Sequence, residues 1–220
     1  MPELQILVMD TENVDSRLSL VADFLTNLSS RQTLTKWFLA GNIGVAPLPA
    51  SGFPILDFDS PRYLSFVSKK ETSIAEYTPL LCAGNFPSLE RMEVCLTVGH
   101  TLGQSLSPTK IWRDFFKHLR SATTDSLFAI DIMIKGPTAC QVSFEDIPDL
   151  QLFPLESFET NLFHSLSAYN LWMMTTCWPG LVGLYISGVD KVTIDFSSLV
   201  EIADLSPLLE YLEIQINSQA

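Results

Sequence analysis

Residues 178–188 read WPGLVGLYISG, and their apolar skeleton Leu181-x-x-Leu184-x-Ile186 decides the fold because it recurs along the chain. It returns as SPLLEYLEIQI at 206–216 and appears earlier as FPSLERMEVCL at 86–96. Apolar residues that alternate with others indicate a strand that buries one face. One such strand cannot cover its own apolar face, so a repeated strand indicates a stack of similar units.

The central apolar residue of each block recurs about every 28 residues. Successive steps are 30, 27, 28, 38, about 25, about 29 and 28 residues. An interval in this range is typical of leucine-rich repeats, in which each strand is followed by a segment that returns over the outside. The central residues are Leu7, Trp37, Leu64, Met92, Ile130, a blurred copy near 155 between Leu152 and Phe158, Leu184 and Leu212.

The segments between these blocks carry helical signals. We predict helices over 14–30, after Ser73, from Pro108, from Ser167 and from Ser198, with Ser73-x-x-Glu76 and Ser198-x-x-Glu201 as capping boxes. The predicted fold is therefore α/β: one leucine-rich-repeat solenoid over residues 1–220, with seven or eight repeats of about 28 residues. Its parallel strands line the concave face of a horseshoe and its helices lie outside. Leu7, Met92, Ile130, Leu184 and Leu212 are expected in one inward row.

Composition limits the partners. The net charge is −12 and the pI is near 4.5, which argues against nucleic acid and suits a basic protein segment. The four cysteines form no CxxC pair, so no metal is expected, and the N-terminus lacks the features of a signal peptide. A cytoplasmic or nuclear protein is predicted. Thr160–Val189 carries no charge, but its change of period favours a buried helix, a turn and a buried strand over a membrane span.

The later repeats resemble a known family. LWMMTTCWPGLVGLYISG, followed by TIDFSSLVEIADLSPLLEYLEIQIN, is similar to the repeat region of fungal F-box proteins, especially those of mushroom-forming fungi. The shared features are the Trp178-Pro179 pair before a strand and Ser206-Pro207 before the next, over roughly residues 80–217. The resemblance implies a substrate-recognition scaffold of a ubiquitin ligase.

The F-box module itself has no counterpart, because the chain opens on the repeat ELQILVM. The resemblance therefore implies a missing N-terminal module, and a Skp-type adaptor is an expected partner only if an F-box lies upstream. An in-frame F-box in the upstream transcript favours the ligase receptor. The alternative in the same class is a stand-alone binding module without ligase coupling.

Catalytic signals are weak. The sequence contains no phosphate-binding loop, nucleophile elbow or zinc-protease motif, so no enzyme, catalytic residue or cofactor is predicted. A cysteine hydrolase is the alternative from a different class. It requires Cys82, Cys95, Cys140 or Cys177 to meet one of the histidines, His100, His118 or His164.

Surface recognition remains. Residues between the inward positions are free to serve a ligand, and those of the later repeats combine carboxylates with tyrosines. Such a surface suits a basic peptide, because charge steers it and aromatic rings anchor it. The predicted partner-binding residues are Arg91, Glu93, Asp131, Tyr185, Tyr211 and Glu213.

Overall fold

The computed structural model describes residues 4–10, 18–20, 22–41, 43–45, 55–98, 107–136 and 141–216. It is an α/β fold built on one eight-stranded sheet in which all neighbouring strands run parallel. The strand order follows the chain. In that order the strands are β1 (Ile6–Asp10), β3 (Lys36–Ala40), β6 (Tyr63–Glu71), β8 (Arg91–Thr97), β9 (Ala129–Lys135), β10 (Ser157–Thr160), β12 (Gly183–Val189) and β14 (Tyr211–Ile216).

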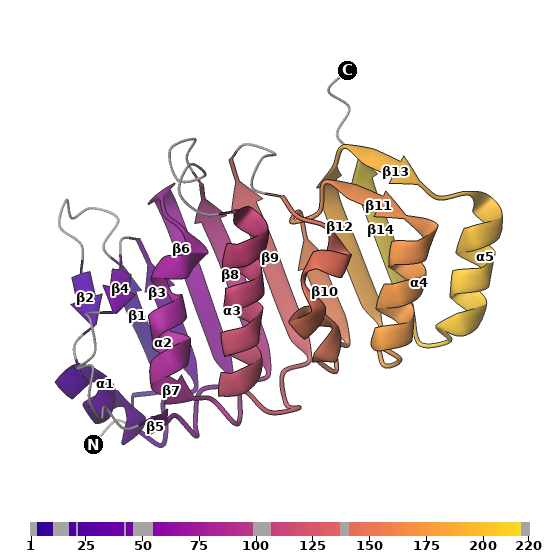
Figure 1. Ribbon diagram of the computed structural model, residues 1–220. Coiled ribbons are helices and arrows are strands. Elements are labelled where there is room, and N and C mark those ends of the chain that lie inside the picture. Colours follow the sequence, from indigo (N-terminus) through magenta and orange to yellow (C-terminus); the bar gives the residue numbers. More distant parts are fainter. Residues whose placement is uncertain are drawn as a thin grey trace.

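The connections lie together on one side of this sheet and leave the other face open (Figure 1). The helices are α1 (Ala22–Ser29), α2 (Thr78–Ala83), α3 (Pro108–Ala122), α4 (Ala168–Cys177) and α5 (Phe196–Leu205), with 3-10 turns η1 (Ile74–Glu76), η4 (Phe144–Asp146) and η5 (Pro148–Leu152). Three parallel two-stranded ladders complete the connections: β2 (Leu18–Leu20) with β4 (Ile43–Val45), β5 (Leu56–Asp57) with β7 (Gly84–Asn85), and β11 (Ser165–Ser167) with β13 (Lys191–Thr193).

The central apolar residues of the repeat pair with one another across the whole sheet. This confirms the predicted row, with one correction: the blurred block is centred on Phe158 and not near 155. The row reads Leu7, Trp37, Leu64, Met92, Ile130, Phe158, Leu184 and Leu212.

The row faces the helices. Met92, Ile130, Phe158 and Leu184 are fully buried, as period-two alternation requires. The two edges differ: the side chain of Leu7 is half-buried, and Leu212 is 36% exposed because β14 has a neighbouring strand on one side only.

Aromatic rings fill the space between sheet and helices. Trp37 lies edge-on to Phe58 with ring centroids 4.8 Å apart, and Phe58 stacks on Phe86 at 4.9 Å. In the later repeats Trp178 lies 5.1 Å from Phe158. These contacts join successive repeats, so the core is continuous along the stack.

The sheet is not curled (Figure 1). The predicted horseshoe and its concave face are therefore absent from this part of the chain, and the outward side chains stand on an open sheet face. The outer layer is uneven: α2 spans six residues and α3 spans fifteen, and 3-10 turns replace a helix between β9 and β10.

Three predicted helix starts are corrected. Within 14–30 the described residues form β2 and then α1, so the helix is shorter than expected. Ser73 caps η1 by accepting a hydrogen bond from the Ala75 amide, and not an α-helix. The N-cap of α5 is Asp195, whose carboxylate accepts from the Ser198 amide at 2.7 Å, so Ser198 lies inside the helix. The predicted starts at Pro108 and Ser167 are confirmed.

The uncharged segment 160–189 forms helix α4, a turn at Pro179-Gly180 and strand β12, as predicted, with the short strand β11 before the helix. In the described part of the chain, no helix has the length and apolar character needed to cross a bilayer.

The strand register predicts that inward side chains contribute far more to stability than their outward neighbours. We expect Phe158→Ala to lower the free energy of unfolding by about 3–5 kcal/mol, because it empties a buried site under Trp178. Its neighbour Ser157 points to the open face, so Ser157→Ala should change stability by less than about 0.5 kcal/mol. Urea unfolding followed by circular dichroism measures both. A cost for Phe158→Ala no larger than that for Ser157→Ala would contradict the register.

Candidate interaction site

The outward residues next to the buried row form a second row on the open face. Strand pairing aligns Val8, Phe38, Ser65, Glu93, Asp131, Glu159, Tyr185 and Glu213. Three carboxylates therefore stand side by side on β8, β9 and β10, and a fourth stands beyond Tyr185 on β14. We call this set of four carboxylates the acidic row.

Sequence reasoning placed Glu93, Asp131, Tyr185 and Glu213 on one face, and the structure brings all four into this row. Arg91 and Tyr211 lie two residues earlier on their strands, and both are exposed on the same face. Arg91, Glu93 and Asp131 have partners within the chain, Tyr185 and Glu213 line an open pocket, and Tyr211 belongs to neither group.

The carboxylate of Glu93 is occupied within the chain. It accepts hydrogen bonds from the Tyr63 hydroxyl and, at 3.1 Å, from the Ser65 hydroxyl. Burial, together with the hydrogen bond and the charge of Glu93, raises the pKa of Tyr63 to about 12. Tyr63 is thus held as a neutral donor, and the Glu93 carboxylate is stabilised by two hydrogen bonds from within the chain.

Asp131 is also occupied. Its Oδ2 accepts from Arg91 Nη2 at 2.5 Å and from Arg91 Nε at 3.0 Å. Burial raises the pKa of Asp131, which is only 8% exposed, and the guanidinium offsets part of that rise. Arg91 and Asp131 therefore form an ion pair in which each is the other's counter-ion.

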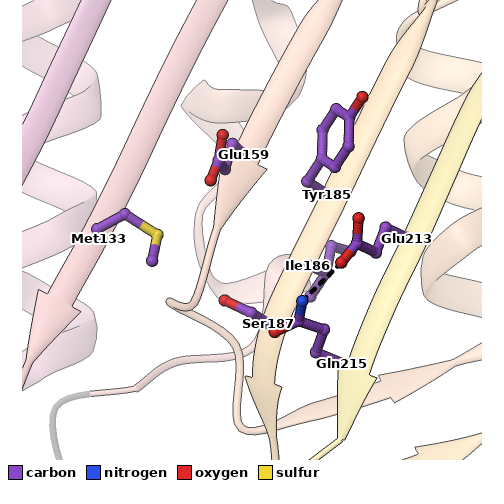
Figure 2. Close-up of a pocket in the computed structure, with 7 residues that line it drawn as sticks. All are labelled: Met133, Glu159, Tyr185, Ile186, Ser187, Glu213 and Gln215. Carbon is purple, nitrogen blue, oxygen red and sulfur yellow. Dashed lines mark hydrogen bonds between the residues drawn. The ribbon is translucent and has the colours of Figure 1, made fainter.

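The other half of the acidic row is open. Glu159, Tyr185 and Glu213 project from the neighbouring strands β10, β12 and β14 toward the same side (Figure 2). They line a pocket of about 270 Å³ together with Met133, Ser187, Gln215 and part of Ile186. The pocket is open to solvent and combines two carboxylates, a phenol ring and a thioether.

Neither carboxylate of this pocket pairs with a lysine or arginine among the described residues. Glu213 Oε1 accepts a hydrogen bond from the amide of Gln215 at 2.6 Å (Figure 2). Burial raises the pKa of Glu159, and the nearby carboxylates of Asp131, Glu213 and Glu93 raise it further, against the opposing charge of Arg91. Glu159 thus lies among other carboxylates and has no ion pair of its own among the described residues.

The absence of a side chain at Gly183 leaves room for the Tyr185 ring. A Cβ at Gly183 would lie 3.2 Å from Cε2 of the Tyr185 ring, closer than most such contacts. The absent side chain lets the ring lean over the strand, and the ring then forms one wall of the pocket.

Sequence reasoning missed Glu159 because it centred the blurred repeat near 155. The block is Leu155-x-x-Phe158-x-Thr160, in which threonine replaces the third apolar residue. Thr160 is fully buried and its hydroxyl accepts from the Leu162 amide at 2.9 Å, so a polar residue satisfies an inward position. Phe158 is the residue that aligns with the central apolar residues of the neighbouring repeats, so Glu159, which follows it, belongs to the outward row.

Among the described residues, one contact between a cysteine and a histidine matches the hydrolase alternative. Cys82 Sγ on α2 lies 3.3 Å from His118 Nδ1 on α3, on the helical side of the molecule. The Cys82 side chain is exposed, and partial desolvation beside the neighbouring helix raises the pKa of its thiol. Cys140 and His100 lie outside the described residues.

No group of three or more histidine, cysteine, aspartate or glutamate side chains suited to a metal ion occurs in the described ranges. Comparison with protein-family models, with curated proteins and with solved structures finds no match to this chain.

The two halves of the acidic row should respond differently to charge reversal. We expect Asp131→Lys to lower the free energy of unfolding by about 1–3 kcal/mol, because it places an ammonium beside Arg91 at a buried position. Glu213→Lys, on an exposed edge, should stay within about 0.5 kcal/mol of the wild type. Chemical denaturation compares the two, and equal stabilities would contradict the different roles described for them.

Proposed function

We propose that this chain is a protein-interaction scaffold whose open sheet face binds a basic segment of a partner protein. The observation that carries the proposal is the register of Glu159, Tyr185 and Glu213, which places two carboxylates on the strands flanking that of an aromatic residue, and neither carboxylate has a cationic partner among the described residues. Negative charge steers a basic segment to the surface, and an aromatic side chain is a frequent anchor of binding energy.

The repeat supports the same proposal. A strand and a return segment recur about every 28 residues, and the strands pair in chain order, which is the organisation of a leucine-rich-repeat solenoid. We propose that the chain is a flat variant of this architecture. Inward residues then stabilise the stack, and outward residues remain free to be selected for a partner.

The resemblance of residues 80–217 to fungal F-box proteins narrows the proposal further: the partner is a substrate presented to a ubiquitin ligase in the cytoplasm or nucleus. Coupling through a Skp-type adaptor needs an F-box, so a stand-alone binding module is the alternative. Both versions use the same open face, and the contact between Cys82 and His118 keeps a hydrolase as the alternative from another class.

Binding of a basic probe tests the proposal. A fluorescein-labelled peptide of alternating lysine, arginine and serine residues should bind the wild type, with an affinity that falls as salt rises. Glu159→Gln/Glu213→Gln should weaken binding about tenfold or more, because both open carboxylates lose their charge. Fluorescence anisotropy gives the dissociation constants.

The matched control is Glu201→Gln/Asp204→Asn, which removes the same charge from exposed positions on α5, on the helical side. It should leave binding within about twofold of the wild type. Equal weakening by both double variants would mean that overall charge, and not the open face, attracts the peptide.

Binding should also depend on pH. The raised pKa of Glu159 means that its carboxylate takes up a proton at a pH above the ordinary 4.5. As pH falls from neutrality, Glu159 loses its charge at a higher pH than a glutamate of ordinary pKa, so affinity for the probe should begin to drop before such a glutamate titrates. Glu159→Gln should remove this early phase. An unchanged pH profile in that variant would exclude Glu159 as the source.

A further inference from the structure

We propose that the pocket between Glu159 and Glu213 accepts one arginine side chain of the partner, with the guanidinium bridging the two carboxylates over Tyr185. This inference rests on the proposed function and makes it more specific: a basic segment is held by an arginine anchor, and the remaining positive charges of the segment serve mainly for steering.

The spacing of the carboxylates favours a planar cation. Glu159 and Glu213 are aligned on β10 and β14, with β12 between them, so their backbones lie about 9.6 Å apart, twice the strand spacing of about 4.8 Å. A guanidinium carries five N–H donors along its edges and can donate to a carboxylate on each side. An ammonium is a compact point charge that pairs with one carboxylate at a time over such a distance.

The walls of the pocket suit the same group. Tyr185 lies on the strand between those of the two carboxylates, and its ring, which leans toward Gly183, forms one wall of the pocket. Guanidinium planes stack on aromatic faces. Met133 from β9 adds a thioether to the lining, which can contact the aliphatic stem of an arginine (Figure 2).

The position of Glu213 is set in advance. The Gln215 amide donates to its Oε1, which leaves the second carboxylate oxygen for a partner. Arg91 on β8 is a cation of this face, but Asp131 on β9 holds it in an ion pair. The pocket therefore presents negative charge that the described residues leave without a cationic partner, and a positively charged side chain from outside complements it.

Three peptides that differ only at one central residue test the anchor. The residue is arginine, lysine or citrulline, and the flanking lysines and serines are identical. Fluorescence anisotropy at constant salt measures each dissociation constant. We expect the arginine peptide to bind about tenfold more tightly than the lysine peptide, and the citrulline peptide, which keeps the shape without the charge, to bind most weakly.

Tyr185→Leu separates anchoring from attraction. It leaves every charge in place, so the lysine peptide should bind it as it binds the wild type, and the arginine peptide should lose most of its advantage. Phe38→Leu, an aromatic replacement on β3 in the same outward row, is the control and should preserve the arginine advantage.

The outcomes distinguish this inference from the function it rests on. If arginine and lysine peptides bind equally, and Glu159→Gln/Glu213→Gln weakens both, the open face binds basic segments and the arginine anchor is wrong. If Tyr185→Leu keeps the full preference for arginine, the anchor lies elsewhere and the inference is likewise overturned. If no peptide binds the wild type, the inference and the proposed function both fail.

Discussion

Parallel pairing in a fixed register is the constraint on which this molecule depends. Each strand turns alternate residues toward the helices, and the row from Leu7 to Leu212 must be apolar because it supplies the core between two layers. A shift of one residue in any strand would expose its buried set. The same constraint aligns the outward residues, so eight positions on the open face are placed side by side although packing does not fix their identity.

The outward carboxylates differ in whether the chain itself supplies them with hydrogen-bond or ion-pair partners. In the middle of the sheet the chain supplies its own partners: Tyr63 and Ser65 donate to Glu93, and Arg91 pairs with Asp131. Toward β14 the described residues supply no cation, and Glu159 and Glu213 have no ion pair with any of them. The first group resembles a structural network, in which loss of one member leaves a partly buried group unsatisfied. We propose that another molecule completes the interactions of the second group.

Much of the fold could be predicted from the sequence because the buried row repeats. Leu-x-x-Met-x-Val around Met92 and Leu-x-x-Leu-x-Ile around Leu184 each specify a strand, its inward face and its neighbours. The pattern weakens where an inward position holds a polar residue, as at Thr160, whose hydroxyl accepts a hydrogen bond in the core. Because of this threonine the repeat was centred on the wrong residue, and Glu159 was not included in the candidate site.

The partners of the carboxylates were beyond sequence reasoning. Tyr63 reaches Glu93 from the neighbouring strand, and nothing in the local sequence of either residue indicates the contact. The flatness of the sheet was also beyond sequence reasoning, because a repeated strand specifies which residues face inward but not the curvature of the sheet. The 3-10 turns Phe144–Asp146 and Pro148–Leu152 lie just before the blurred repeat centred on Phe158.

The central claim is that the open face at β10, β12 and β14 binds a basic segment. Methionine methyl resonances test it most directly, because Met133 lines the pocket while Met92 and Met174 are buried beneath the open face. In protein with labelled methionine methyl groups, titration with an arginine-containing basic peptide should shift the Met133 signal and leave those of Met92 and Met174 in place. A titration that saturates with Met133 unmoved would contradict the account.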